Sequence, residues 1–535
     1  MKNEAEHAES NALTFAMDRR QIILRGLAFG LSLPTIGSGI LPALADTAKR
    51  GGTVKVGLIV PTGPVDPVMM SHLGAVNTVL IGAEYLTFPR SDFSLEGRLA
   101  TNWRPTVADE WIFELRKGVL FHNGQEMTSA DVVATFDRLT DPASNSAAMQ
   151  SLGGILSKGG TTAIDSYTVK FKLNRPYLDF PYLVSAFSYN TAILPTDYQI
   201  GQFTDRPVGT GPYMLESFAV QSGAVFVRNP KYWEPELPYV DRLEVQYFAD
   251  ANAQILALQS GSIDIIPTVE PAAFRTLQGN ADINLLSAPS SSMQLVHMRT
   301  DSGPFADKRV RQALALAVDR EQLVSALLDG HASVGNDHLV FPTSELGSLV
   351  AKRVKQRARD IAKAKDLLTE AGYPNGIQVE LTTSRLFECV DHAALIQQMG
   401  REAGFDIKLN IMTPDAYFAA GENSPWLTAP FGITNWGSRG TPAQLIQATM
   451  LSSSSWNSAH FKNAEFDALA TVLDSELDQT KLEDAVTKIA QIMVDETPAG
   501  ISYFKEQIRV TSKRLAGMPA GPGDFPDFRS IWVTA

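Results

Sequence analysis

The sequence predicts an α/β fold in which layers of helices pack on sheets. Segments that alternate apolar and polar residues, typical of strands, are interleaved along the whole chain with segments of helical periodicity. Hydrophobic residues make up 44% of the 535 residues and charged residues 19%, which is enough apolar material for a large core. A chain of this length has room for about two to four domains.

Four segments predict strands. Residues 53–60 are rich in β-branched residues and run into the turn-forming segment 61–64, which carries two prolines and a glycine. Residues 111–115, 169–173 and 407–411 alternate apolar and polar side chains, so each is expected to bury one face against a core.

Three further segments predict helices with recognisable ends. Thr128 precedes a helix with Asp131 in its first turn, where a carboxylate stabilises the free N–H groups. Residues 309–328 predict two consecutive helices, the second capped by Asp319. Residues 363–371 predict a helix that ends at Gly372.

Charge and cysteine content exclude several kinds of function. The chain holds 46 Lys plus Arg against 58 Asp plus Glu, a formal net charge of −12, which argues against a nucleic-acid partner. The single cysteine, Cys389, excludes an intrachain disulfide and a thiolate zinc or iron–sulfur centre.

No motif predicts catalysis, a metal or a cofactor. The sequence lacks a His-Glu-x-x-His helix, a Gly-x-Ser-x-Gly elbow, a phosphate-binding Gly-Lys-Ser/Thr loop and a Gly-x-Gly-x-x-Gly turn. The pair Ser502 and Lys505 matches Ser-x-x-Lys, a two-position pattern expected by chance in a chain this long, and no Lys-Thr-Gly accompanies it. His392 follows Cys389 by three residues, and a buried thiol is the favoured interpretation of that cysteine.

The N-terminus predicts export. Asp18-Arg19-Arg20-Gln21-Ile22-Ile23 resembles a twin-arginine signal, an apolar stretch follows, and residues 43–45 provide a small-x-small cleavage pattern that ends at Ala45. A buried N-terminal helix is the alternative. The polar stretch before Met17 leaves open whether translation starts at Met1 or Met17. We expect a mature protein in the periplasm.

Four stretches carry a resemblance to a known family. In order along the chain they are residues 97–124, residues 207–213 with 228–233, residues 308–320 and residues 364–376. The third stretch, 308–320, is the most specific. They resemble the extracytoplasmic solute-binding proteins (family 5) that serve ABC importers for oligopeptides, dipeptides, nickel complexes and opines.

The resemblance implies a two-lobed periplasmic-binding-protein fold with an extra domain inserted in the first lobe. By analogy, lobe I takes residues 46–88, 209–288 and 503–535, the extra domain residues 89–208, and lobe II residues 289–502. The implied partners are a small-molecule ligand and an ABC permease and ATPase complex in the inner membrane, and the protein is expected to be a monomer. Peptide binding, nickel-complex binding, a chemoreceptor role and a periplasmic hydrolase remain the alternatives.

The segment 431–442 is the predicted site of selectivity. In peptide-binding members a strand of this kind ends in Gly-Trp-x-x-Asp, whose Asp pairs with the amino terminus of the peptide. Here Trp436 holds the Trp position, but Arg439 stands where the Asp is expected. A guanidinium suits carboxylate or phosphate and repels a free ammonium, so we expect a ligand with an anionic group. An Arg439 that points to solvent or pairs with a carboxylate of its lobe is the alternative.

Further ligand contacts are predicted from position alone. Gly437 and Ser438 lie beside Trp436, Arg385 precedes a helix, and an exposed Trp456 is suited to stack on a ligand. The remaining predicted contacts are Asn457, Tyr85 and Tyr503.

Overall fold

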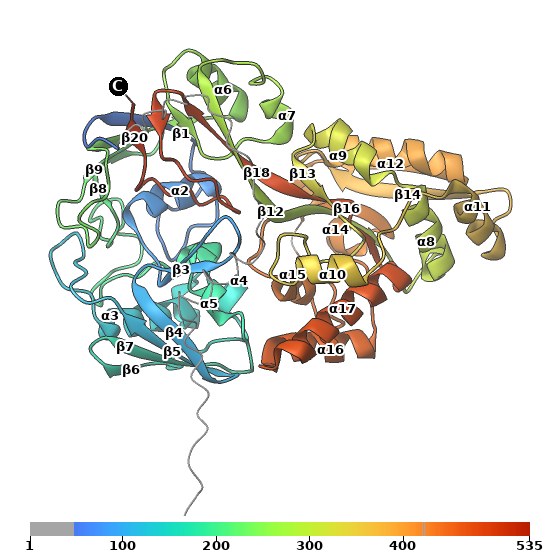
Figure 1. Ribbon diagram of the computed structural model, residues 1–535, viewed down its shortest axis with the longest axis horizontal. Helices are drawn as coiled ribbons and strands as arrows, with labels where there is room; N and C mark the ends of the chain where they lie inside the picture. Colours follow the sequence, from blue (N-terminus) through green and yellow to red (C-terminus); the bar gives the residue numbers. More distant parts are fainter. Residues whose placement is uncertain (1–47, 420, 422, 535) are drawn as a thin grey trace, which may run out of the picture. The chain divides into compact units, whose positions relative to one another are not determined.

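Most strands of the protein join one mixed sheet (Figure 1). A computed structural model describes residues 48–419, 421 and 423–534, so the predicted export signal and its cleavage site lie outside the described residues. The sheet follows the order β15 (Phe405–Met412), β14 (Ile377–Ser384), β16 (Phe431–Trp436), β12 (Ile283–Met298), β18 (Tyr503–Ser512), β11 (Ile265–Ile266), β1 (Thr53–Ile59), β10 (Arg242–Phe248), β9 (Gly223–Arg228), β8 (Tyr213–Ala219), with β13 (Ala332–Val334) beside β18 and β17 (Ala499–Gly500) beside β12.

Two long strands connect the halves of this sheet. One end of β12 pairs antiparallel with β18, and its other end pairs antiparallel with β16. The register with β18 shifts between Pro289 and Met293, where a bulge bends the strand. We call the part around β14–β16 lobe II and the part around β1 and β8–β10 lobe I, and the predicted boundary between residues 288 and 289 falls next to this bulge.

Lobe II has helices on both faces of its strands. Phe431 and Ile433 of β16 pack into one apolar core, and Trp436, whose position has the opposite parity, packs into the core on the other face. The helices of lobe II are α8 (Lys308–Ala317), α9 (Arg320–Leu328), α10 (Gly347–Arg353), α11 (Ile361–Glu370), α12 (Cys389–Ala403), α13 (Pro414–Tyr417), α14 (Pro425–Thr428), α15 (Pro442–Thr449), α16 (Ala464–Ser475) and α17 (Gln479–Glu496), with a 3-10 turn at Pro304–Ala306.

Lobe I is built on β1, which pairs in parallel with β10 and β11. Val54 and Val56 of β1 are fully buried with Phe226 and Leu243 of the neighbouring strands. Its further elements are α2 (Leu73–Gly82), α6 (Ala251–Gln259), α7 (Pro271–Phe274) and the short pair β19 (Leu515–Ala516) and β20 (Trp532–Val533).

A separate antiparallel sheet forms the inserted domain. Its strand order is β4-β5-β7-β6, and Phe113 and Phe171 on adjacent strands pack edge to face with centroids 5.4 Å apart. The elements here are β2 (Thr87–Pro89), β3 (Leu95–Gly97), β4 (Ala100–Val107), β5 (Glu110–Leu115), β6 (Thr161–Asp165), β7 (Thr168–Lys172), α3 (Ser129–Thr140), α4 (Met149–Leu152), α5 (Phe180–Leu183) and 3-10 turns at Pro142–Ser144 and Ala186–Thr191.

The predicted elements are confirmed with small changes of their ends. The four predicted strands correspond to β1, β5, β7 and β15. The Asp131 carboxylate accepts the Thr128 N–H at 2.8 Å at the start of α3, and Asp319 accepts the Gln322 N–H at 3.0 Å at the start of α9. Cys389 is buried, as predicted. Among the described residues no helix is long and apolar enough to cross a membrane.

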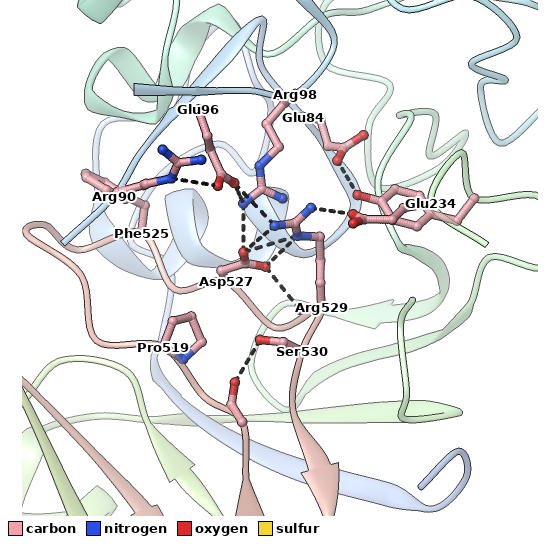
Figure 2. Close-up of polar contacts among 12 residues, drawn as sticks. Glu84, Arg90, Glu96, Arg98, Glu234, Pro519, Phe525, Asp527, Arg529 and Ser530 are labelled. Carbon is pink, nitrogen blue, oxygen red and sulfur yellow. Dashed lines mark hydrogen bonds and ion pairs between the residues drawn. The ribbon is translucent and has the colours of Figure 1, made fainter. Parts of the chain in front are cut away.

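A network of ion pairs joins the C-terminal segment to the start of the inserted domain and to Glu234 of lobe I (Figure 2). Arg98 lies 2.7 Å from both Glu96 and Asp527, and its side chain is only 5% exposed. Arg529 pairs with Asp527 at 3.0 Å and with Glu234 at 2.8 Å. The network therefore joins residues more than 400 positions apart.

Replacing Arg98 with Met is expected to lower the free energy of unfolding by on the order of 3 kcal/mol, because the partly buried carboxylates of Glu96 and Asp527 lose a cation. Arg90→Met is the matched control, since Arg90 pairs with the same Glu96 from a side chain that is 56% exposed. The control should cost less than about 1 kcal/mol. Urea unfolding measures both, and equal losses would contradict a structural role for the buried pair.

Candidate ligand-binding site

The loop that follows β16 is fixed to the bulge of β12. The Arg439 N–H donates to Ser291 Oγ at 2.7 Å, and that hydroxyl lies 2.7 Å from the Arg439 carbonyl oxygen. Ser292 Oγ donates to the Trp436 carbonyl at 2.8 Å. The backbone that carries Arg439 is thus anchored where the chain crosses between the lobes.

The Arg439 side chain is partly buried and has no carboxylate partner. Its one hydrogen bond within the described part of the chain joins Nη1 to the Ser438 carbonyl at 3.3 Å, and no ion pair there includes it. Burial lowers the pKa of its guanidinium, yet arginine stays protonated at neutral pH. Most of its N–H donors are therefore left without a protein acceptor.

Arg439 lines a cavity of about 490 Å³ between lobe II and the inserted domain. Tyr177, Tyr189 and Asn190 come from the inserted domain, while Gln444 and Trp456 come from lobe II. Arg175 also lines it, but Asp474 holds that guanidinium at 2.6 Å. No described lining residue is an Asp or a Glu, so Arg439 supplies the uncompensated charge of the cavity.

Trp456 is the second predicted site residue that lines this cavity. Trp436, Gly437 and Ser438, from the loop that carries Arg439, do not line it. The Trp436 ring is buried against Trp456, with centroids 5.9 Å apart. Ser438 Oγ accepts the Ser291 N–H at 3.2 Å, and Gly437 is exposed next to it.

Four further predicted contacts lie away from this cavity. Tyr85 and Tyr503 are each 1% exposed and lie in the cores, where their hydroxyls donate to the Tyr189 carbonyl and to Glu388. The Asn457 amide bonds the carbonyls of Leu451 and Phe461, which fixes its own loop. Arg385 is exposed at the end of β14, outside the cavity.

The sequence interpretation missed the inserted-domain side of the cavity. Arg175 and Asp474 are 299 positions apart, and no local pattern marks their pairing. Gln444 and Gln447 could have been found from the sequence. They lie three residues apart on α15, which begins three residues after Arg439, so both project from the same face of the helix.

A strip of direct contacts joins the inserted domain to lobe II beside the cavity. The Thr441 hydroxyl donates to Asp179, and the Leu178 N–H donates to the Asp474 carbonyl at 3.0 Å. The Tyr182 ring lies on Gly440 so closely that a Cβ there would be 2.3 Å from Tyr182 Cδ1. We call these pairs, with Arg175–Asp474, the contact strip.

Two carboxylates of the contact strip have raised pKa values. Burial raises the pKa of Asp179 to about 7, with further increases from the charges of Asp474 and Glu345 and a partial offset from the Thr441 hydrogen bond. Burial also raises the pKa of Asp474 to about 6, against the opposing effect of Arg175. Both groups therefore take up a proton at a higher pH than a free aspartate does, and Asp474 stays mostly ionised at neutral pH beside Arg175.

Asp179→Asn is expected to make the protein more stable than wild type at pH 8, by on the order of 1 kcal/mol, and equally stable near pH 4. A raised folded-state pKa means that the wild type loses stability as the pH rises from about 4 to about 7. Urea unfolding from pH 4 to 8 measures the difference, with Asp205→Asn as an exposed control. A difference that does not change with pH would contradict this assignment.

A second buried charged group lies at the ends of β14, β16 and β18. Lys505 Nζ donates to Asn435 Oδ1 at 2.9 Å and lies 3.3 Å from Glu388 Oε1, and these two charged side chains are 9% and 6% exposed. Burial raises the pKa of Glu388, but the charge of Lys505 outweighs burial with the help of hydrogen bonds, and the net pKa is lowered. This pair stabilises the base of the loop that carries Arg439.

A family model matches most of the chain. The model described as bacterial extracellular solute-binding proteins, family 5 Middle, matches residues 94–458. The glutathione-binding protein GsiB of Shigella flexneri serotype 5b is 28% identical over 458 residues, which cover 82% of this chain and 86% of that protein.

Solved structures of periplasmic binding proteins share the fold. DppA from Helicobacter pylori in complex with the peptide STSA matches with a TM-score of 0.71 and 21% identity, over 91% of this chain and 99% of that one. AgaA from A. tumefaciens R10 in complex with agropinic acid matches with a TM-score of 0.70 and 22% identity, over 90% and 99%. The predicted two-lobed fold with an extra domain in the first lobe is confirmed.

Proposed function

Because the chain belongs to the family 5 bacterial extracellular solute-binding proteins, which serve ABC importers, we propose that its solute carries an anionic group that binds Arg439. The predicted family and transport role are confirmed, since the match covers residues 94–458 and the relatives are solute-binding proteins. The nature of the solute is the part that we propose.

The uncompensated charge of Arg439 carries this proposal. A cation that is partly buried and faces no carboxylate leaves unfavourable desolvation for a ligand to offset. A carboxylate or phosphate on the solute supplies the acceptors that the guanidinium lacks. Since Asp474 already neutralises Arg175, one anionic group balances the cavity.

The rest of the solute is expected to be neutral where it touches the cavity. The Gln444 NH2 group and the Asn190 side-chain oxygen offer a donor and an acceptor, because the Asn190 NH2 group and both ends of the Gln447 amide already bond to the protein. Trp456 offers an apolar face. Two relatives are named for ligands that carry carboxylates, agropinic acid for AgaA and glutathione for GsiB. Opine-like compounds, modified amino acids and sugar acids fit the same description.

An unmodified peptide is the second candidate, because DppA holds the peptide STSA. A peptide whose ammonium lay at Arg439 would meet like-charge repulsion in a cavity of low dielectric constant. An unmodified peptide therefore fits only in the reverse orientation, with its terminal carboxylate at Arg439.

Capture is proposed to involve closure and no chemistry. A solute in this cavity contacts both lobe II and the inserted domain, so it stabilises the arrangement in which the contact strip is formed. We further propose export by the twin-arginine route with cleavage after Ala45, and a periplasmic monomer that delivers the intact solute to its permease and ATPase.

Mass spectrometry of small molecules released on denaturing the purified protein tests the proposal. We expect a compound with a carboxylate or phosphate, recovered unchanged after a second incubation with the protein. A neutral or purely cationic compound would contradict the role of Arg439, and a converted compound would contradict capture without chemistry.

A further inference from the structure

A second cavity, of about 410 Å³, lies on the contact strip and has the opposite charge. Gly440, Thr441, Asp179 and Tyr182 of the strip line it, and it shares no lining residue with the Arg439 cavity. Its walls come from the inserted domain and from lobe II, so a molecule bound there touches both.

Three carboxylates line this second cavity from separate segments of the chain. They are Asp92, Asp179 and Glu345, and none of the described lining residues is a Lys, Arg or His. No ion pair within the described residues includes any of the three; Asp92 bonds only Ser94 near its own turn, and Asp179 accepts from Thr441. No described lining residue therefore offsets the negative charge of these carboxylates.

The charges of all three carboxylates reach the Tyr182 hydroxyl, which belongs to the same cavity wall. After burial, their charges are what raise the pKa of the Tyr182 hydroxyl, in the order Asp179, Glu345, Asp92. Carboxylates that line one cavity repel one another, and a cation bound in that cavity reduces the repulsion.

The other walls are apolar. Phe93, Leu178 and Leu346 line the cavity, as do Leu473 and Leu482 from α16 and α17. Phe93 is itself packed on Phe341 of lobe II, with centroids 4.7 Å apart, and the Tyr182 ring offers a second aromatic face. The described residues hold no group of three or more potential ligands placed for a metal ion. Apolar walls with a negative edge match an organic cation.

We propose that this cavity is a second ligand site, which binds an organic amine. The ammonium lies among Asp92, Asp179 and Glu345, and the apolar body lies against Phe93, Leu346 and Leu482. Aromatic faces at Phe93 and Tyr182 favour a cation further. An amine bound there holds the inserted domain against lobe II, and so favours closure around a solute in the Arg439 cavity.

Calorimetric titration of the full chain with 1-hexylamine tests the site. 1-Hexanol is the neutral probe of the same shape, and we expect hexylamine to bind at least about tenfold more tightly. The double variant Asp92→Asn with Glu345→Gln alters exposed side chains and is expected to weaken hexylamine about tenfold while leaving hexanol unchanged. Glu236→Gln, on the surface and outside the cavity, is the control and should change neither probe.

Two further variants test whether hexylamine binds in this cavity. Leu482→Trp fills the cavity and should abolish hexylamine binding, whereas Arg439→Ala should leave it unchanged. The proposal would be overturned if hexylamine bound no more tightly than hexanol. It would also be overturned if the double variant and Leu482→Trp left the affinity for hexylamine unchanged. Since these readouts do not involve Arg439, they fail or succeed independently of the proposed function.

Discussion

Valine in place of Gly440 is expected to weaken solute binding about tenfold to hundredfold while both lobes stay folded. The Tyr182 ring of the inserted domain lies on Gly440, and any Cβ there would come within 2.3 Å of Tyr182 Cδ1. Because Gly440 lies directly after Arg439, the added side chain would hold the inserted domain away from the cavity. Closure would then cost strain that the solute has to offset.

The experiment compares solute affinity by calorimetry with unfolding by urea. Gly437→Ala is the matched control on the same loop, since a Cβ at Gly437 meets only Arg439 Nη1, at 3.9 Å. Adding Tyr182→Ala to Gly440→Val should restore most of the affinity by making room. If the double variant binds as poorly as Gly440→Val, the contact strip is not what controls closure.

Lys505→Met is expected to lower the free energy of unfolding by about 3 kcal/mol at pH 7, because Glu388 remains buried without its cation. The pH dependence follows from the sign of the pKa change. With Lys505 present, the lowered pKa of Glu388 contributes stability above about pH 4.5, and that stability is lost as the pH falls through the folded-state pKa. The gap between variant and wild type should therefore shrink toward pH 4.

Glu388→Gln in the Lys505→Met background is the test of mechanism. Removing both charges leaves no unpaired buried carboxylate, so the double variant should recover a large part of the lost stability. Urea unfolding at pH 7 and pH 4.5 measures wild type, Lys505→Met, Glu388→Gln and the double variant. If the stability lost in the double variant equalled the sum of the losses in the two single variants, packing and not the ion pair would be responsible.

Local sequence signals predicted much of the fold. Capping residues such as Asp131 and Asp319 bond to residues within three positions, so the starts of α3 and α9 could be predicted from the sequence alone. The bulge of β12 at Pro289–Met293 was not, because it depends on two different partner strands meeting one long strand. Long-range pairing of this kind leaves no short-range pattern.

The site was predicted in part for the same reason. Arg439 and Trp456 lie on one cavity because both belong to the loops around α15, near in sequence as well as in space. Arg175 and Tyr189 come from the inserted domain, and nothing local connects them to residue 439. Tyr85 and Tyr503 were assigned to the ligand from their position near the expected edges of the lobes, but both are buried.

The most direct test of the anionic-solute account is calorimetry of the released solute with wild type, Arg439→Gln and Arg385→Gln. Gln keeps hydrogen-bonding capacity but removes the charge, and Arg385 is an exposed arginine outside the cavity. The account predicts a loss of affinity of about tenfold to a hundredfold for Arg439→Gln, and none for Arg385→Gln. Equal affinity in all three proteins would contradict it.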